Sequence, residues 1–198
     1  MTQWDSFVKR AFDVVCAAIG LILFGWLILL AWGIMTLDAG CNGMFVQVRV
    51  GRYGRLFKVY KIRTMRPDRL LDSTVTTSRD PRITRIGRMM RRLKLDELPQ
   101  LFNVLIGDIS LVGPRPDVPG YADTLSGEDR LVLSVRPGLT GPATLKYRDE
   151  ETLLASVADP ERYNREVIYP DKIAINKDYV RNYSFLKDLR YILRTLLR

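Results

Sequence analysis

The sequence predicts an α/β fold that is mostly helical, with a small β-hairpin and an N-terminal re-entrant membrane helix. Three observations predict it: a long run without charges near the N-terminus, a short stretch that alternates apolar and basic residues, and apolar side chains at helical spacing in much of the remainder. We expect a membrane segment over residues 1–40 and a larger domain over residues 41–198, which ends in an amphipathic helix.

The membrane segment is predicted by 24 residues without a charge, from Val14 to Leu37. At about 1.5 Å per residue, a helix of this length could cross a hydrocarbon core about 30 Å thick. Basic residues flank the run on both sides, and the positive-inside rule keeps both flanks cytoplasmic. A helix that enters the membrane, bends near Gly25 and returns satisfies both flanks. A single span and a cleaved signal peptide are the alternatives, and they fit less well.

A β-hairpin is predicted next, with strands over Phe45–Val50 and Leu56–Ile62 around a turn that contains glycine. Residues 67–81 are polar and lack periodicity, which is typical of a loop. An amphipathic helix then begins near Thr84, because apolar residues return at helical spacing. These residues are Ile86, Met89, Met90 and Leu93.

A second helix is predicted to begin at Asp96, a suitable N-cap that leaves Pro99 in the first turn. Gly107 can end this helix. Its buried side is expected at Leu98, Leu101, Phe102 and Leu105. The segment ISLVGPRP predicts a short strand, RPGLTGP predicts a turn, and one terminal amphipathic helix is expected from about Ile173.

The composition excludes several kinds of catalytic site. The chain has 198 residues, a formal net charge of +9, two cysteines and no histidine. Without histidine there is no Ser-His-Asp triad, no Cys-His pair and no His-ligated zinc, so catalysis would depend on carboxylates, other polar side chains or an oxygen-bound metal. Residues 39–120 account for the whole net charge, which indicates an anionic partner such as phosphate, a lipid headgroup or nucleic acid.

The adjacent pair Asp96 and Glu97 is the sharpest chemical feature. One carboxylate could attack an electrophile while the other holds a cation, and a helix N-terminus near arginines should favour ionised Asp96. A divalent cation would let an anionic carboxylate approach a phosphoryl group. The structural alternative is helix capping, for which Asp followed by Glu is common.

Basic residues form a second candidate site. Lys61 and Arg63 end the predicted hairpin, and Arg115 lies between two prolines, where it loses little conformational freedom on binding phosphate. The alternative for Arg115 is an internal salt bridge or a solvated turn. Nucleic acid is not the expected partner, because aromatic residues are sparse in the basic segment and no zinc-finger or RNA-recognition motif occurs. A phosphate-bearing lipid or a nucleotide sugar is expected instead.

Four motifs occur in order: FDVVCAAIGLILF, FKVYKIRTM, DPRITRIGRMMRRLKLDELPQLFNVLIGDISLVGPRP and RPGLTG. Together they resemble the monotopic bacterial sugar transferases, also called polyprenol-phosphate phosphoglycosyl transferases, and in particular the small members with little beyond the catalytic core. The resemblance implies an enzyme on the cytoplasmic face of the bacterial inner membrane. Such an enzyme transfers a sugar 1-phosphate from a UDP-sugar to undecaprenyl phosphate, the first membrane step of a glycoconjugate pathway such as exopolysaccharide synthesis.

The resemblance also implies roles for individual residues. Asp96 would be the nucleophile that forms an aspartyl-phosphosugar and releases UMP, and Glu97 would help to hold Mg²⁺. The phosphate-binding residues that it implies are Arg115, Lys61, Arg63, Arg88 and Arg148. Family members bend the membrane helix at a Ser-Pro pair, and Gly25 and Trp26 stand at the corresponding positions here. Asn176 stands where a carboxylate is often found, so no catalytic role is expected of it.

Two rival functions remain at this point. A non-enzymatic membrane adaptor could use the basic segment to bind anionic lipid or nucleic acid, and an inactive relative could keep the fold. The intact Asp-Glu and Pro-Arg-Pro motifs argue against the inactive relative. The motifs do not specify the sugar, the pathway or the oligomeric state, and they are compatible with a homo-oligomer.

Overall fold

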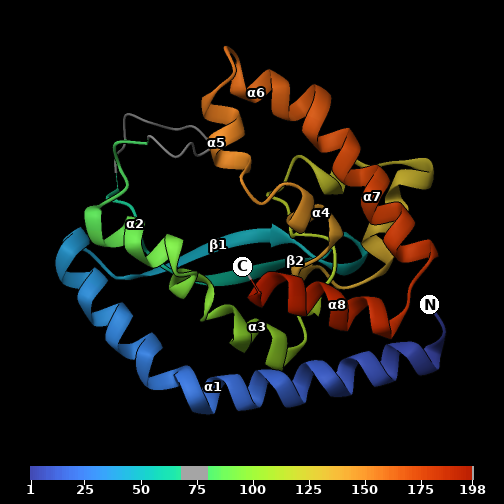
Figure 1. Ribbon diagram of the computed structural model, residues 1–198, viewed down its shortest axis with the longest axis horizontal. Coiled ribbons are helices and arrows are strands. Elements are labelled where there is room, and N and C mark those ends of the chain that lie inside the picture. Colours follow the sequence, from blue (N-terminus) through green and yellow to red (C-terminus); the bar gives the residue numbers. More distant parts are fainter. Residues whose placement is uncertain (68–79, 198) are drawn as a thin grey trace.

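The computed structural model describes residues 1–67 and 80–197, so that the loop expected over residues 67–81 lies mostly outside the described residues. The strands are β1 Met44–Val50, β2 Leu56–Ile62, β3 Ser110–Val112 and β4 Gly138–Thr140. The helices are α1 Gln3–Ala39, α2 Arg85–Arg92, α3 Gln100–Ile106, α4 Pro142–Lys146, α5 Glu150–Ala155, α6 Pro160–Tyr163, α7 Tyr169–Arg181 and α8 Phe185–Leu196 (Figure 1). The mostly helical fold and the hairpin are thereby confirmed.

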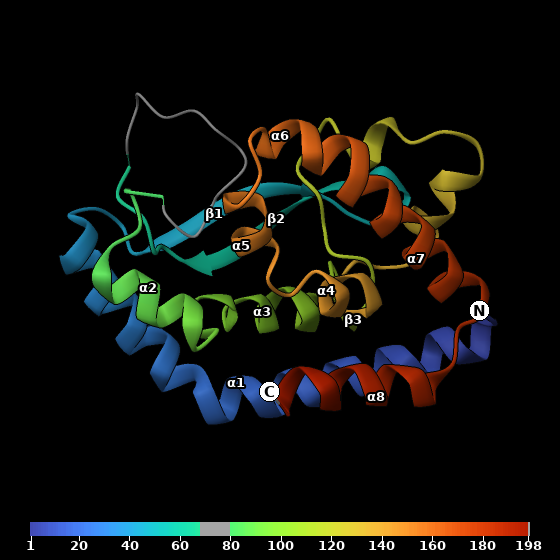
Figure 2. The ribbon, with the colours of Figure 1, turned by 45° about the horizontal axis from the view of Figure 1, so that its top comes forward.

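The long helix α1 is uninterrupted. It begins with a capping box, in which the Thr2 hydroxyl accepts a hydrogen bond from the Asp5 backbone and the Asp5 carboxylate accepts one from the Thr2 backbone. It ends at Gly40, whose φ of 68° lies in the left-handed region that glycine tolerates. Gly25 and Trp26 lie within the helix, although its direction changes partway along (Figures 1 and 2). The structure therefore shows no helical hairpin, and the re-entrant course stays a prediction.

Polar side chains attach the N-terminal part of α1 to the rest of the molecule. Lys9 Nζ lies 2.5 Å from Asp188 Oδ2 in α8, and Asp13 Oδ1 accepts a hydrogen bond from the backbone of Leu111 in β3 at 3.0 Å. Arg10 donates to two carbonyl oxygens at the end of α3, at 2.6 and 2.8 Å. In consequence α1 lies along α3 and α8 (Figure 2).

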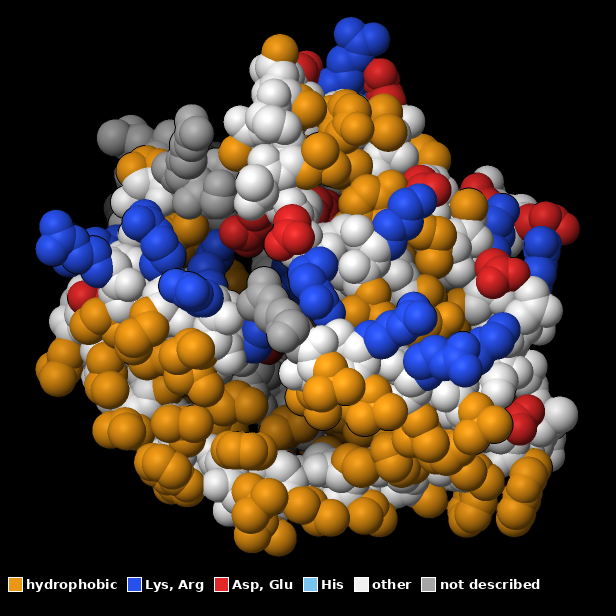
Figure 3. Space-filling view, in the orientation of Figure 1, with side chains coloured by type: hydrophobic (Ala, Val, Ile, Leu, Met, Phe, Trp, Pro, Cys, Tyr) orange, Lys and Arg blue, Asp and Glu red, His pale blue; other side chains and the backbone are white. Residues whose placement is uncertain are grey.

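Apolar side chains gather on the outer surface along α1 and α8 (Figure 3). Among the described residues, α1 is the one helix long and apolar enough to cross a membrane, and little of its most apolar stretch is buried. Helices α2 and α3 also expose large apolar side chains. The exposed residues include Trp4, Phe7, Ile22, Trp26 and Leu29 of α1, Met89 of α2 and Leu93 directly after it, Phe102 and Ile106 of α3, and Leu186, Leu193 and Leu196 of α8.

The hairpin is joined to α3 by Asn103, which is fully buried. The Asn103 amide donates to the carbonyl of Lys58 at 2.7 Å and accepts from the backbone of Tyr60 at 3.1 Å, both in β2. This corrects the expected buried side of α3, because the buried residues are Gln100, Asn103 and Val104, while Phe102 is 47% exposed. The polar face of α3 is buried because its Asn103 pairs with backbone hydrogen-bonding groups at the edge of β2. Part of the apolar face of α3 is therefore exposed on the surface.

The segment RPGLTGP contains a strand where a turn was predicted. β4 pairs in parallel with β3, with Ser110 opposite Gly138 and Val112 opposite Thr140. The two chains approach so closely that a Cβ at Gly138 would lie 2.1 Å from the backbone nitrogen of Gly113. Glycine is therefore required for this contact, and local turn propensity does not reveal a pairing with a strand 28 residues earlier.

The C-terminal segment forms two helices where one was predicted. α7 ends at Arg181 and α8 begins at Phe185, after Asn182 and an extended Ser184. The break lets α8 turn and lie beside α1, where Asp188 contacts both Lys9 and Tyr179. The buried Lys9–Asp188 ion pair thus holds α8 beside α1, although the apolar spacing of the sequence continues from α7 into α8.

Candidate active site

Asp96 and Glu97 lie in a short 3-10 turn, Leu95–Glu97, between α2 and α3. Lys94 precedes the turn with a left-handed φ of 58°, so that the chain changes direction after α2. Helix α3 begins at Gln100 with Pro99 as its N-cap. The prediction that Asp96 caps this helix is therefore wrong, and the capping alternative no longer explains why Asp and Glu stand here.

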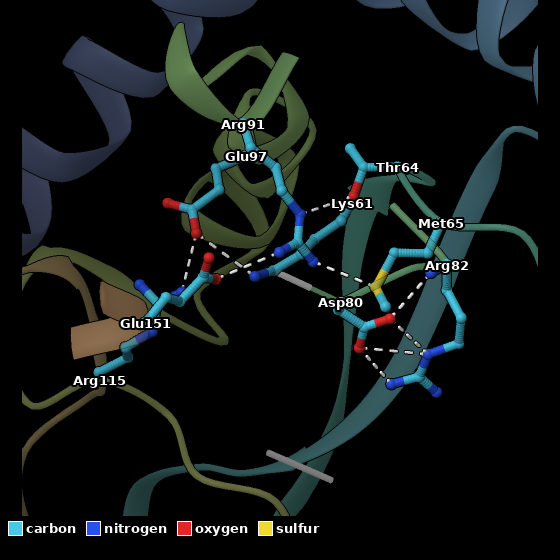
Figure 4. Close-up of polar contacts among 9 residues, drawn as sticks. All are labelled: Lys61, Thr64, Met65, Asp80, Arg82, Arg91, Glu97, Arg115 and Glu151. Atoms are coloured by element: carbon cyan, nitrogen blue, oxygen red, sulfur yellow. Dashed lines mark hydrogen bonds and ion pairs between the residues drawn. The ribbon is translucent and has the colours of Figure 1, made fainter. Parts of the chain in front are cut away.

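Glu97 binds two cations from distant parts of the chain (Figure 4). Its Oε1 lies 2.8 Å from Arg115 Nη2, in the loop after β3, and 3.3 Å from Lys61 Nζ, near the end of β2. Burial by itself would raise the pKa of Glu97, but the positive charges of Arg115, Lys61 and Lys94 hold it well below its usual range. Glu97 is therefore ionised at neutral pH.

Asp96 is in a different environment from its neighbour. Its Oδ1 is buried and has no hydrogen-bond partner within the described part of the chain. Burial, followed by the negative charge of Glu97, raises the pKa of Asp96 to about 6, although Lys61 and Arg91 act in the opposite direction. This corrects the expectation that the surroundings favour the ionised form, because burial outweighs the nearby cations. A carboxylate with a pKa near neutrality and an unpartnered oxygen is typical of a reactive group.

A sequence model of the family "Bacterial sugar transferase" matches residues 4–198. The chain belongs to the bacterial sugar transferase family. It is 37% identical over 209 residues to the undecaprenyl-phosphate glucose phosphotransferase of Komagataeibacter xylinus, with 100% of this chain and 37% of that protein covered. It is 34% identical over 195 residues to the UDP-N-acetylgalactosamine-undecaprenyl-phosphate N-acetylgalactosaminephosphotransferase of Aeromonas hydrophila, with 96% of this chain and 43% of that protein covered.

A shorter family member aligns over nearly its whole length. Exopolysaccharide production protein PSS of Rhizobium leguminosarum bv. phaseoli is 35% identical over 201 residues, which cover 98% of this chain and 95% of that protein. The chain spans about two fifths of the two phosphotransferases above. Membership in the bacterial sugar transferase family and the exposed apolar helix α1 together favour membrane association.

In this family member, Arg91 is an arginine of α2 whose charge acts on Asp96. Arg91 donates to the hydroxyl of Thr64 at 2.9 Å and pairs with Glu151 at 3.2 Å (Figure 4), and its charge lowers the pKa of Asp96. The implied phosphate-binding residue Arg88 is exposed and contacts neither carboxylate. Because the two arginines are three positions apart, helical spacing alone does not decide which of them faces the site.

The remaining implied phosphate-binding residues are separated. Lys61 and Arg115 meet at Glu97, as described above. Arg63 donates to the carbonyl of Asn42 at 2.8 Å, and Arg148 donates to the carbonyl of Arg194 at 2.7 Å near the end of α8. The structure thus brings two of the five implied cations to Glu97.

Two further ionisable side chains near Arg115 were not singled out from the sequence. Burial and the charge of Arg115 lower the pKa of Arg49 to about 10. Burial raises the pKa of Asp117 to about 6, against the opposing charges of Lys172 and Arg49. Both could have been found from the sequence, because Arg49 alternates with apolar residues in β1 and Asp117 directly follows the Pro-Arg-Pro motif.

The carboxylates present suit a metal that takes only part of its ligands from protein. Within the described residues, no three His, Cys, Asp or Glu side chains cluster as a metal site. Mg²⁺ commonly binds one or two carboxylates and completes its octahedral shell with water and substrate phosphate. The unpartnered Asp96 Oδ1 beside Glu97 therefore fits such an ion.

Proposed function

We propose that this chain transfers a sugar 1-phosphate from a UDP-sugar to undecaprenyl phosphate through a covalent intermediate on Asp96. One observation carries the proposal: the buried, unpartnered oxygen of Asp96 lies next to Glu97, which holds two cations suited to phosphate. The names of the relatives, which include glucose and N-acetylgalactosamine phosphotransferases of undecaprenyl phosphate, support the same reaction class.

The proposed reaction consists of two displacements at the sugar-linked phosphorus. First, an Asp96 carboxylate oxygen bonds to this phosphorus, and the bond to the bridging oxygen breaks, so that UMP leaves with the electron pair. Next, an oxygen of undecaprenyl phosphate attacks the same phosphorus and releases Asp96, which yields undecaprenyl diphosphate sugar. Both nucleophiles are anions, so neither step requires histidine as a base.

We assign Glu97 to Mg²⁺, with Asp96 beside it, and Lys61 and Arg115 to the donor phosphates. A bound Mg²⁺ would neutralise phosphate charge so that the Asp96 carboxylate can approach. Arg115 can bind phosphate oxygens through parallel hydrogen bonds, and Lys61 contributes a point charge. Arg91 replaces Arg88 in this proposal, because Arg91 is the one near Asp96. Arg63 and Arg148 are left out, because both contact other parts of the chain.

The proposed location is the cytoplasmic face of the bacterial inner membrane. The exposed apolar side chains of α1 and α8 would lie among lipid tails, and the basic side chains seen above them in Figure 3 would lie near headgroups. This placement suits the chemistry, because a water-soluble donor must meet a lipid-anchored phosphate at the interface.

Intact-protein mass spectrometry tests the proposal. The purified full chain is mixed with Mg²⁺ and UDP-sugars, including UDP-glucose and UDP-N-acetylgalactosamine, without lipid acceptor. We expect a sugar-phosphate adduct on the wild type and on Asp149→Asn, which changes an exposed aspartate, but none on Asp96→Asn.

Addition of undecaprenyl phosphate completes the test. We expect the adduct to disappear as lipid-linked product and UMP accumulate. An adduct on Asp96→Asn equal to the wild type would refute the assignment of the nucleophile. Neither adduct nor product from any UDP-sugar in the panel would refute the transferase proposal and favour the membrane adaptor.

A further inference from the structure

Arg49 of β1 is held in place by neutral groups. Its Nε and Nη2 donate to Gln47 Oε1 at 3.1 and 2.6 Å, and its Nη1 donates to the carbonyl of Pro116 at 3.0 Å. These contacts orient the guanidinium from two sides. They use three of its five N–H groups, so two remain for a ligand.

No carboxylate in the described ranges lies within ion-pair distance of Arg49. Arg115, by contrast, is paired with Glu97. Burial and the charge of Arg115 disfavour the charge of Arg49, and the opposing charges of Asp117 and Glu97 offset this only in part. A partly buried guanidinium beside a second one is unfavourable unless an anion joins them. An amide such as Gln47 orients the charge without neutralising it.

The fold places this guanidinium on the same side as the other phosphate-binding candidates. In the hairpin, Phe45 is opposite Lys61, Gln47 is opposite Val59 and Arg49 is opposite Phe57, so all six side chains leave the same face of the pair. Pro116, whose carbonyl holds Arg49, directly follows Arg115 in the chain. Lys61, Arg115 and Arg49 are thereby brought to one region around Glu97.

We propose that Arg49 is a second guanidinium for the donor's nucleoside diphosphate, and that Gln47 is the positioning residue that keeps it oriented and fully charged. This inference rests on the proposed function, since it assigns a binding group for the donor in that reaction. A diphosphate carries two adjacent anionic groups, so it can engage Arg49 and Arg115 together and relieve their repulsion.

The deciding experiment replaces the amide by a carboxylate. Gln47→Glu should form an ion pair with Arg49, which keeps or raises the thermal midpoint but neutralises the charge offered to phosphate. We expect the Kd for UDP, measured by calorimetry on the full chain in detergent with Mg²⁺, to rise about tenfold or more. Gln3→Glu, the same change on the exposed first turn of α1, should leave the Kd within about twofold of the wild type.

A purely structural role predicts a different result. If Gln47 serves only to fix the loop at Pro116, Gln47→Glu should bind UDP as tightly as the wild type, and that outcome overturns the inference. If Gln47→Glu does not fold, Arg49→Lys decides, because it keeps the charge but lacks the planar fork. Arg49→Lys should also weaken UDP binding about tenfold, and unchanged binding would overturn the inference.

The inference and the proposed function can fail separately. One possible result is that Gln47→Glu weakens UDP binding but the protein makes no lipid-linked product with any UDP-sugar. This result would support the proposed role of Arg49 and refute the transfer reaction. If the wild type makes lipid-linked product and the variants bind UDP as tightly as the wild type, the transfer reaction is supported and the role of Arg49 is refuted.

Discussion

Lys9 and Asp188 are 179 positions apart in the sequence, yet Lys9 Nζ lies 2.5 Å from Asp188 Oδ2 and both side chains are buried. Asp188 also accepts a hydrogen bond from the hydroxyl of Tyr179 at 2.8 Å. The ion pair therefore joins the beginning of α1 to α7 and α8. It makes the long apolar helix part of the folded domain instead of a detached anchor.

Loss of this pair should destabilise the domain. Lys9→Met leaves the Asp188 carboxylate buried without its cation, and we expect the free energy of unfolding to fall by about 3–5 kcal/mol. Denaturant titration in detergent, followed by circular dichroism, measures this change. Lys187→Met, which removes a partly exposed lysine one position away on α8, is the control and should cost little. A loss below about 1 kcal/mol for Lys9→Met would show that the pair is unimportant.

The first half-reaction should depend on pH through Asp96. Because burial raises the pKa of Asp96 to about 6, half of the Asp96 carboxyl groups are protonated near pH 6, and the rate should fall tenfold per pH unit well below that value. Above pH 7 the rate should be nearly constant. Single-turnover release of UMP between pH 4.5 and 8 measures the profile.

A second carboxyl requires a control in that experiment. Asp117 also has its pKa raised to about 6, so it could produce the same acidic limb. If Asp96 is responsible, Asp117→Asn keeps the acidic limb in place. Disappearance of the limb in Asp117→Asn would assign the titration to Asp117 instead.

Removal of the metal or of Glu97 should stop turnover. We expect EDTA to abolish UMP release and added Mg²⁺ to restore it, because two carboxylates and a diphosphate would otherwise repel one another. Glu97→Gln should lower kcat/KM at least about a hundredfold, since it also leaves Lys61 and Arg115 without their shared anion. Full activity in EDTA would contradict the proposed role of the metal.

Two of the four arginines of α2, Arg88 and Arg91, form a matched pair of mutations. Arg91→Gln should lower kcat/KM about tenfold to a hundredfold, whereas Arg88→Gln, at an exposed position, should change it less than about threefold. Arg91→Gln should also move the acidic limb of the pH profile to higher pH, because the charge of Arg91 lowers the pKa of Asp96. Equal effects of the two mutations would contradict this assignment.

Features that depend on nearest neighbours in the chain could be predicted from the sequence. The hairpin strands, the helix capped by Thr84 and the long apolar helix all follow from residue spacing, charge runs and glycine-containing turns. The ordered motifs also single out the Asp96 and Glu97 pair and Arg115, and the structure pairs Glu97 with Arg115. These signals are local, and the local structure agrees with them.

Other features depend on contacts that sequence spacing does not encode. Only the folded chain shows that Glu97 binds Lys61 and Arg115, that Arg91 rather than Arg88 faces Asp96, and that β3 and β4 pair through close glycine contact. The state of Asp96 is the clearest case.

From the sequence, Asp96 has a helix N-terminus and arginines nearby, which predict an ionised carboxylate. In the structure its Oδ1 is buried beside Glu97, and its pKa is raised to about 6. The residue types that the proposed chemistry requires were therefore determined by the sequence alone. Their protonation states and mutual contacts were decided by the tertiary structure, because desolvation and through-space electrostatics depend on which distant segments surround a charge.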